Sequence, residues 1–342
     1  MTVPSAVPDA ASAGDLVARH DALLLDLDGT VYRGGEAVPG AAEAIHESRG
    51  RGVGIRFVTN NAARSPEQVA AHLTELGLAA EASEVNTSAE AGAAMLAERL
   101  SAGATVLVVG TDALAAEVAA VGLVPARVFS AEVAAVVQGH SPHTAWSDLA
   151  EACLAIRAGA LWVACNTDPT LPTERGELPG NGSMVAALRA ATDREPLTAG
   201  KPARPLLDQA IAAADARRPL VVGDRLDTDV AGAAAARLDA LLVLTGVCTP
   251  KELLAAPAGL RPRYVAADLG GLFRPSAEVE IGEQPGWRVQ TSDDTLTVTG
   301  SGDPIALLRA LCAAWWPVGG GQVEPCPTNE GAKAALATLN IG

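Results

Sequence analysis

Two kinds of segment alternate along residues 22–272, and this alternation limits the fold more than any other feature. Short runs rich in leucine and β-branched residues are separated by longer, alanine-rich amphipathic stretches. The pattern predicts an α/β fold, in which parallel strands are joined by crossover helices. The expected strands lie at 22–27, 54–59, 105–109, 133–138, 161–164, 220–222 and 240–244. The segments SPEQ (65–68) and TPKE (249–252) predict two helix starts, because each places a hydroxyl, a proline and a glutamine or glutamate at capping positions.

The pattern changes from about residue 275. Residues 287–300 predict a two-stranded hairpin, and residues 304–316 and 329–339 predict amphipathic helices. The hairpin and helices resemble part of an acyltransferase fold, but the segment lacks the R/Q-x-x-G-x-G/A loop that binds a coenzyme pyrophosphate. We therefore expect a small α+β module with a packing, oligomerisation or regulatory role.

The charge balance limits the partners of the chain. Its 342 residues include 40 acidic and 25 basic side chains, which gives a formal net charge of −15. Nucleic acids and anionic membranes bind cationic surfaces, so neither is an expected partner. No apolar run approaches the roughly 20 residues that span a bilayer. The first 14 residues lack the features of a secretory signal, and the five cysteines are scattered without a C-x-x-C pair, which favours a cytoplasmic protein.

Asp26 and Asp28 stand at the end of the first expected strand, in LLLDLDGT (23–30). An ionised carboxylate among buried leucines is costly unless a cation meets it. The carboxyl ends of parallel strands form the edge at which α/β sheets bind ligands, so we expect both aspartates at that edge. Gly29 would allow the sharp turn that follows, and the Thr30 hydroxyl would hydrogen-bond back to stabilise it. The alternative is an ordinary Asp-Gly turn after an edge strand.

More carboxylates follow the strand at 220–222, in GDRLDTD (223–229). We expect Asp224 at the same sheet edge as Asp26, where two carboxylates and phosphate oxygens would form a hard oxygen site suited to Mg²⁺. Asp227 and Asp229 could instead be N-terminal charges on the following helix. We assign that surface role to Asp227, and to Asp229 a supporting position behind the metal ligands.

Hydroxyl, amide and ammonium groups stand at the ends of two further segments. FVTNN (57–61) places Thr59 and Asn60 where they could bind phosphate oxygens, although such a turn is often only structural. Lys201, in GKP, is one of three lysines in a chain whose usual cation is arginine. This choice favours a compact point charge over a solvated surface lysine. His140 and His143, in GHSPH, are expected to be loop residues rather than a metal pair.

Taken together, DLDGT, TNN, GKP and GDRLDTD resemble, in order and spacing, the four motifs of the haloacid-dehalogenase superfamily. The likeness is to its small-molecule phosphatases related to nitrophenylphosphatases, and it extends to VPGAAEAI (38–45), ARSPEQ (63–68) and NTDPTLPTERGELPGNG (166–182). It covers about residues 22–272. The length and the carboxy-terminal extension are most similar to those of bacterial glycerol 3-phosphate phosphatases.

This resemblance implies an aspartyl-phosphate mechanism. Asp26 would be the nucleophile, and Asp28 would act as the acid and then the base for the leaving group and water. Mg²⁺ would be held by the carboxylates of Asp26 and Asp224 and by the main-chain carbonyl of Asp28. The groups that would bind the transferring oxygens are Thr59, the main-chain amide of Asn60, and Lys201.

The resemblance also implies three parts. These are a Rossmann-like parallel-sheet core (15–82 and 196–274), an inserted α/β cap (83–195) and the α+β extension (275–342). Closure of the cap would exclude water and select the leaving group. The chain departs from many relatives at GHSPHTAW (139–146), where they have a glycine-x-aspartate and later Thr-Tyr, so their substrates transfer only weakly. His140, Asn166 and Asp168 are candidates for substrate contacts, and loop or turn roles are the simpler alternatives.

The function that the sequence favours is a Mg²⁺-dependent phosphatase of small phosphomonoesters, with glycerol 3-phosphate as the preferred substrate. Pyridoxal phosphate, phosphoglycolate and nucleotide monophosphates are the alternative substrates. A phosphate-sensing or scaffolding protein with a silent site is an alternative of another class. Intact Asp26, Asp28 and Lys201 argue against it, because a silent site has no need of an acid and base. The sequence leaves open whether the chain forms a homo-oligomer.

Overall fold

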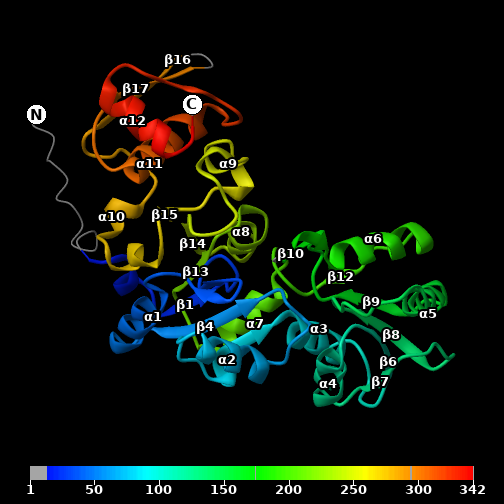
Figure 1. Cartoon of the computed structure of the whole chain (residues 1–342). Helices are drawn as coiled ribbons and strands as arrows, with labels where there is room; N and C mark the ends of the chain where they lie inside the picture. Colours follow the sequence, from blue (N-terminus) through cyan, green and yellow to red (C-terminus); the bar gives the residue numbers. More distant parts are fainter. Residues whose placement is uncertain (1–13, 174, 293–294, 342) are drawn as a thin grey trace, which may run out of the picture. The chain divides into compact units, whose positions relative to one another are not determined.

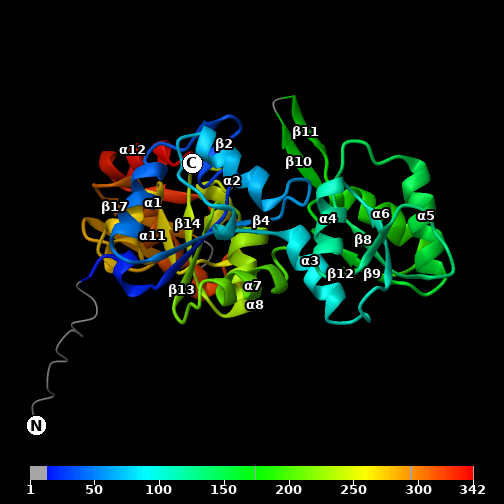
Figure 2. The same ribbon diagram turned by 90° about the horizontal axis from the view of Figure 1, so that it is seen from below.

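The structure is a computed structural model that describes residues 14–173, 175–292 and 295–341. The described residues form two compact units (Figures 1 and 2). Unit 1 takes in the described residues of Met1–Arg33, Val38–Ile55 and Ala216–Gly342, and unit 2 takes in those of Gly34–Ala37 and Arg56–Asp215. Each unit is described separately below.

Unit 1 is built on parallel strands in the order β15-β14-β13-β1. Their bounds are β1 (Ala22–Leu25), β13 (Pro219–Gly223), β14 (Asp239–Val243) and β15 (Tyr264–Ala266). All residues of β1 and β13 are buried, as in strands of a parallel sheet that is covered on both faces. The α-helices of this part are α1 (Ala41–Gly50), α8 (Ala231–Ala236) and α9 (Pro250–Leu254).

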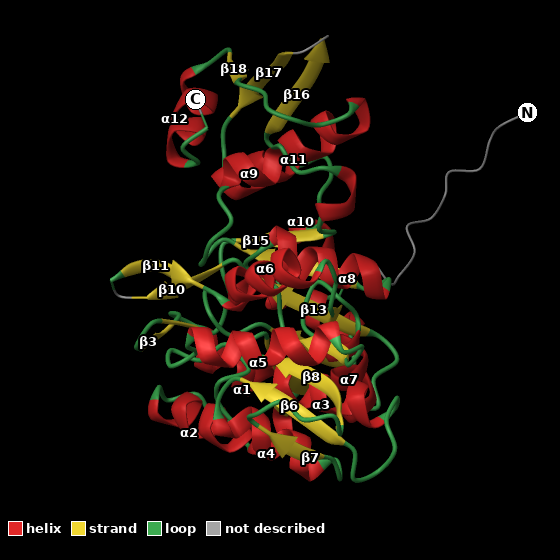
Figure 3. Ribbon diagram, turned by 90° about the vertical axis from the view of Figure 1, so that its right-hand side faces the viewer, coloured by secondary structure: helices red, strands yellow, loops and turns green. Residues whose placement is uncertain are grey.

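The carboxy-terminal part of unit 1 is a small sheet with three helices (Figure 3). The sheet consists of β16 (Trp287–Ser292), β17 (Thr295–Gly300) and β18 (Pro325–Pro327), and the helices are α10 (Ser276–Val279), α11 (Pro304–Trp315) and α12 (Glu330–Thr338). The predicted hairpin and both predicted helices are confirmed. Arg309 of α11 is buried and donates a hydrogen bond to the carbonyl oxygen of Val265 in β15 at 2.7 Å, which fastens this part to the parallel sheet.

Unit 2 contains β4 (Gly54–Thr59) from Arg56 onward, which pairs in parallel with β5 (Val85–Thr87), and a five-stranded parallel sheet in the order β12-β9-β8-β6-β7. The strands of the sheet are β6 (Thr105–Val109), β7 (Val124–Ala126), β8 (Val133–Gln138), β9 (Leu161–Ala164) and β12 (Leu197–Thr198). An antiparallel hairpin joins β10 (Thr170–Thr173) to β11 (Gly176–Pro179). The helices are α2 (Pro66–Glu75), α3 (Ser88–Ala97), α4 (Asp112–Ala120), α5 (Trp146–Arg157), α6 (Asn181–Thr192) and α7 (Pro205–Ala213). Two-residue strands, β2 (Tyr32–Arg33) and β3 (Glu36–Ala37), follow β1 in the chain.

The predicted α/β class and four of the seven predicted strands, those at 54–59, 105–109, 133–138 and 161–164, are confirmed with the same bounds. The first strand ends at Leu25, two residues earlier than predicted, and β14 begins and ends one residue earlier. Both predicted capping boxes are present, at Ser65 and at Thr249. The short strands β5, β7, β12, β15 and β18 were not predicted, because two or three residues carry too little periodicity to be recognised.

Candidate active site

Asp26 and Asp28 follow β1 at the carboxyl edge of the unit 1 sheet. The Asp26 main-chain N–H donates to the carbonyl oxygen of Val222 at 2.8 Å, so the chain stays beside β13 for one residue after the strand ends. Asp26 is half-buried, whereas Asp28 is exposed and its Oδ2 accepts a hydrogen bond from the Tyr32 hydroxyl at 3.3 Å. The two aspartates therefore differ in access to solvent.

A tight turn follows these aspartates. Gly29 has φ +83°, the left-handed conformation that glycine adopts without strain, and its N–H donates to the Tyr32 carbonyl oxygen at 2.7 Å. The prediction that the Thr30 hydroxyl stabilises the turn is wrong. Thr30 Oγ1 is buried and has no hydrogen-bond partner among the described residues, and main-chain hydrogen bonds close the turn instead.

Asp224 follows β13 and is fully buried. Its Oδ2 accepts a hydrogen bond from the main-chain N–H of Val247 at 2.6 Å. Two glycines enclose this carboxylate: a Cβ added at Gly29 would lie 2.4 Å from Asp224 Oδ2, and one added at Gly246 would lie 1.9 Å from it. The close approach of these two loops fixes the position of the carboxylate.

Asp229 lies in a π-helical turn, Leu226–Val230, and is 1% exposed. The Arg225 main-chain N–H donates to Asp229 Oδ2 at 3.1 Å, and a Cβ added at Gly223 would lie 2.2 Å from Asp229 Cγ. Asp227, on the same turn, is exposed and its carboxylate accepts hydrogen bonds from the Arg225 guanidinium at 3.0 and 2.7 Å. These hydrogen bonds lower the pKa of Asp227 below its ordinary value. Only one of the two carboxylates therefore points into the protein.

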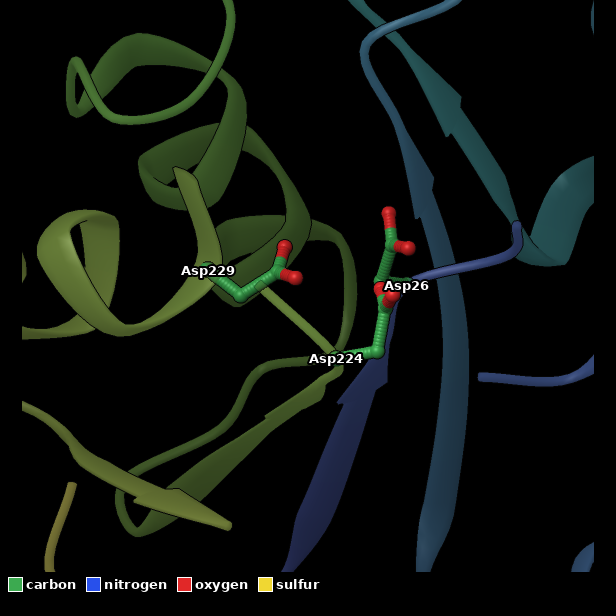
Figure 4. A group of neighbouring side chains, drawn as sticks. All are labelled: Asp26, Asp224 and Asp229. Atoms are coloured by element: carbon green, nitrogen blue, oxygen red, sulfur yellow. The ribbon is translucent and has the colours of Figure 1, made fainter. Parts of the chain in front are cut away.

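Asp26, Asp224 and Asp229 form one cluster (Figure 4). Each offers a carboxylate oxygen, and these oxygens lie within 4.8 Å of one another. In the described part of the chain, no other group of three or more histidine, cysteine, aspartate and glutamate side chains could hold a metal ion. Carboxylates this close repel one another, and a divalent cation among them offsets the repulsion. A donor set made only of oxygen suits Mg²⁺ or Ca²⁺, so the residues present fit such an ion.

The other predicted site residues, Thr59, Asn60 and Lys201, lie in unit 2. Thr59 is the last residue of β4 and is 6% exposed, and its hydroxyl oxygen accepts a hydrogen bond from the Asn61 main-chain N–H at 3.1 Å. Lys201 is 2% exposed, and its Nζ donates to the carbonyl oxygen of Val58 at 3.1 Å. The Lys201 ammonium group therefore lies at the carboxyl end of β4, where Val58 directly precedes Thr59 in the sequence.

The Asn60 side chain has a role that the sequence did not reveal. Its Nδ2 donates to the Lys201 carbonyl oxygen at 2.9 Å, and its Oδ1 accepts from the Lys201 main-chain N–H at 2.8 Å. A Cβ added at Gly200 would lie 2.5 Å from the same Oδ1. Asn60 therefore fixes the main chain that carries Lys201. The amide pair in TNN was the only sequence signal for this bridge, and it did not identify a partner 141 residues away.

Asn166 and Asp168, the candidates for substrate contacts, belong to the same hydrogen-bond network. Asn166 Nδ2 donates to the Asn60 carbonyl oxygen at 2.7 Å, and Asn166 Oδ1 accepts from the Asp168 main-chain N–H at 3.2 Å. The Asp168 carboxylate accepts from Asn60 Nδ2 at 3.1 Å. Asn181 was not predicted, and its Nδ2 donates to the Asn166 carbonyl oxygen at 2.7 Å. These contacts show the turn role that was the simpler alternative for Asn166.

His140 and His143 differ in their surroundings. His140 follows β8 and is half-buried, and burial lowers its pKa below the ordinary value. His143 is exposed, and its main-chain N–H donates to Ser141 Oγ at 3.2 Å. Neither histidine belongs to the carboxylate cluster.

Comparison with known proteins identifies the class. Residues 23–124 match the family model for haloacid dehalogenase-like hydrolases, and residues 198–272 match a second, HAD-hydrolase-like model. The chain belongs to the haloacid dehalogenase-like hydrolase family, which confirms the resemblance drawn from its four motifs. Residues 284–341 match a model for a GCN5-related N-acetyltransferase like domain, in line with the acyltransferase likeness of the carboxy-terminal segment.

Individual relatives narrow the class further. The D-glycerol 3-phosphate phosphatase of Mycobacterium tuberculosis is 50% identical in a 336-residue alignment that covers 94% of this chain and 94% of that protein. The 5'-nucleotidase YutF of Bacillus subtilis is 38% identical over 227 residues, or 66% of this chain and 87% of that protein. The crystal structure of the M. tuberculosis glycerol phosphate phosphatase in complex with magnesium superposes with a TM-score of 0.91 at 50% identity, covering 96% of this chain and all of that one. Among the described residues, no helix has the length and apolar character needed to cross a membrane.

Proposed function

We propose that this protein is a Mg²⁺-dependent phosphatase that hydrolyses a small phosphomonoester, with glycerol 3-phosphate as its preferred substrate. The observation that carries the proposal is the cluster of Asp26, Asp224 and Asp229 at the carboxyl edge of β1 and β13. The substrate is supported by the M. tuberculosis glycerol 3-phosphate phosphatase, which is similar to this chain along nearly the whole length of both proteins.

In the first step, a carboxylate oxygen of Asp26 attacks phosphorus as the bond from phosphorus to the glycerol oxygen breaks. Asp28 donates its proton to the departing alkoxide. In the second step, Asp28 takes a proton from water as the water oxygen attacks phosphorus, which releases inorganic phosphate and restores the Asp26 carboxylate. The exposure of Asp28 and its hydrogen bond from Tyr32 support this assignment, because a group that serves an alkoxide and then water has to meet both.

The carboxylates of Asp26 and Asp224 and the main-chain carbonyl of Asp28 would hold Mg²⁺. When bound, this ion supplies the positive charge that lets an anionic nucleophile approach an anionic phosphate. We place Asp229 behind these ligands, where the Arg225 main-chain N–H orients it. Its burial supports a role in fixing the position of Asp224 rather than in contacting substrate.

Thr59, the Asn60 main-chain amide and Lys201 would bind the oxygens of the transferring phosphoryl group and stabilise the charge that develops on them. The burial of Lys201 supports this role, because a desolvated ammonium group interacts more strongly with an anion than a solvated one does. Asn60 holds the Lys201 main chain through two hydrogen bonds, so the ammonium group starts from a fixed point.

We propose a domain division into a core (15–82 and 196–274), a cap (83–195) that selects the leaving group, and an α+β module (275–342). The second hydrolase match, which begins at residue 198, and the separate match from residue 284 support the proposed boundaries near residues 196 and 275. We also propose a cytoplasmic location without nucleic-acid partners, which the five free cysteines and the net charge of −15 support. Whether the chain forms a homo-oligomer is left open.

The test is phosphate release from a panel of glycerol 3-phosphate, phosphoglycolate, pyridoxal phosphate and a nucleoside monophosphate, each with Mg²⁺. We expect kcat/KM for glycerol 3-phosphate to exceed that for every other member by at least about tenfold, a preference of roughly 1.4 kcal/mol in the transition state. If the enzyme prefers the nucleoside monophosphate, that compound replaces glycerol 3-phosphate as the proposed substrate. The B. subtilis relative, a 5'-nucleotidase, favours this alternative. No phosphate release from any member would contradict the phosphatase assignment itself.

A further inference from the structure

A cavity of about 620 Å³ lies in unit 1, at the sheet edge opposite to the aspartate cluster. The residues that line it directly precede three parallel strands: His20 is two residues before β1, Arg218 is one residue before β13, and Arg237 is two residues before β14. Asp26 follows the first of these strands, and Asp224 and Asp229 follow the second. Strands of four or five residues, at about 3.3 Å per residue, separate the two edges by about 13–17 Å.

The cavity wall is strongly basic. Arg19, Arg217, Arg218 and Arg237 are among the residues that line it, together with one acidic residue, Asp239. Asp239 pairs with Arg263 at 2.9 Å, and the two oxygens of the Asp21 carboxylate accept the main-chain N–H groups of Arg217 and Arg218 at 2.9 Å each. Within the described residues, no carboxylate lies within 4.0 Å of any of the four guanidinium groups. A chain with a net charge of −15 therefore gathers four arginines without ion pairs around one cavity.

His20 adds a fifth group to this wall. It is only 9% exposed, and its Nδ1 lies 3.1 Å from the Arg218 carbonyl oxygen. A carbonyl oxygen can only accept, so Nδ1 carries the hydrogen. The other ring nitrogen, Nε2, is buried and has no hydrogen-bond partner in the described part of the chain. Protonation of the ring would add one more positive charge to the residues that line the cavity.

We propose that this cavity is a binding site for a small polyanion that carries two or more linked phosphate groups, separate from the carboxylate cluster. Planar guanidinium groups pair with phosphate oxygens through parallel N–H donors, and a single monoanion would leave most of the four positive charges uncompensated. The volume falls within the roughly 300–1,000 Å³ of small-molecule sites. The basic residues surround one hollow rather than forming a long stripe, which favours a small ligand over a nucleic acid. The proposal goes beyond the phosphatase function and does not depend on it.

The binding test uses the full chain after passage over a chelating resin, because without a bound metal the aspartate cluster repels anions. Calorimetric titration with tripolyphosphate is expected to show saturable binding of one ligand per chain. Affinity should rise from orthophosphate to pyrophosphate to tripolyphosphate. ATP serves as a second probe: equal affinity for ATP and tripolyphosphate identifies the linked phosphates as the whole determinant, and tighter binding of ATP adds the nucleoside. Absence of saturable tripolyphosphate binding overturns the proposal, and equal affinity for citrate overturns its phosphate specificity.

Substitutions locate the bound ligand. The double variant Arg218→Gln with Arg237→Gln removes two guanidinium groups and is expected to weaken tripolyphosphate binding by at least about tenfold, because each group would form charge-assisted hydrogen bonds with phosphate oxygens. Arg288→Gln, compared with Arg218→Gln alone, is the matched control, because it removes one positive charge by the same substitution at an exposed position on β16 of unit 1, outside the cavity. Each variant is checked for an unchanged thermal unfolding midpoint. Unchanged affinity in the double variant, or an equal loss in Arg288→Gln and Arg218→Gln, overturns the proposal.

Discussion

The two edges of the parallel sheet in unit 1 carry opposite charges. Where the chain leaves β1 and β13, it places Asp26 and Asp224, and where it enters β13 and β14, it places Arg218 and Arg237. The residues between these ends are almost entirely apolar and buried. A strand covered on both faces cannot carry charge in its middle, so charged groups are confined to the two ends. The sign of the charge can therefore differ between the two ends of the strands. It determines whether an edge can bind a cation or an anion.

The two edges also differ in how tightly they are built. Asp224 and Asp229 are buried, and glycines at positions 29, 223 and 246 make room for them. At the other edge Arg217, Arg218 and Arg237 are exposed around an open cavity. Buried charges interact more strongly with their surroundings than solvated charges do, so substitutions at the carboxyl edge should have the larger effects.

Removal of the proposed nucleophile should have the largest effect. Asp26→Asn is expected to lower kcat for glycerol 3-phosphate by at least about 10⁴-fold, because an amide cannot form the covalent intermediate. Asp227→Asn is the matched control on the same edge, since this carboxylate is exposed and pairs only on the surface with Arg225, and it should change kcat by less than about threefold. Phosphate release and far-ultraviolet circular dichroism measure activity and fold. Retention of more than about one per cent of activity in Asp26→Asn would contradict the covalent mechanism.

A second comparison separates the carboxylates within the cluster. Asp224→Asn is expected to raise the Mg²⁺ concentration for half-maximal activity by more than about 100-fold, and Asp229→Asn by about 10–100-fold, because groups that only orient a ligand typically have the smaller effect. Titration of phosphate release with Mg²⁺ gives both values. If Asp229→Asn has the greater effect, Asp229 is itself a ligand and its proposed position behind Asp224 is wrong.

The site at the carboxyl ends of the strands was predictable from the sequence, whereas the cavity at their amino ends (the amino edge) was not. Asp26 interrupts a run of leucines, and a carboxylate in that setting requires a cation, so one short segment identifies both the strand and its site. In the sequence, each arginine of the amino edge, such as Arg19 or Arg237, looks like an ordinary surface charge. Only the parallel register of β1, β13 and β14 brings residues 19–20 together with residues 217–239, about 200 positions later in the chain, around one cavity.

Long-range side-chain contacts set a second limit. Buried strands such as β6 and β8 were predicted with the right bounds, because an uninterrupted apolar run is a local signal. The bridge from Asn60 to Lys201 and the unpartnered hydroxyl of Thr30 depend on segments that meet only in the folded chain. β18 was missed for a local reason: the sequence Pro-Cys-Pro is atypical of a strand.

Glycine substitution tests how tightly the carboxyl edge is packed. Gly246→Ala places a Cβ 1.9 Å from Asp224 Oδ2, so the carboxylate or the loop has to move. We expect a loss of about 1–3 kcal/mol in the free energy of unfolding and a weaker response to Mg²⁺. Gly259→Ala is the control, because nothing lies within 4 Å of its added Cβ, and the free energy of unfolding should change by less than about 1 kcal/mol. Urea unfolding measures the free energy of unfolding of both variants. Equal values would show that the loop at Gly246 can move to make room for the added Cβ at little cost.

The smallest expected effect is at the amino edge and depends on pH. Burial lowers the pKa of His20 below its ordinary 6.5; the nearby Asp239 carboxylate opposes this shift, and Arg19 and Arg218 reinforce it. The unfolded chain therefore binds a proton more readily than the folded chain as the pH falls below about 6.5, so the free energy of unfolding decreases between that pH and the lower folded pKa.

Urea unfolding at pH 7.5 and 5.5 measures this effect. The free energy of unfolding should fall more between the two pH values in the wild type than in His20→Asn. His140, whose pKa burial also lowers, contributes equally to both proteins and cancels in this comparison. Tripolyphosphate should reduce the wild-type loss, because a bound anion next to His20 would stabilise the positive charge of its protonated ring. An equal loss in both proteins without ligand would mean that His20 takes up its proton as easily in the folded chain as in the unfolded one, and that this edge is as solvated as an ordinary surface.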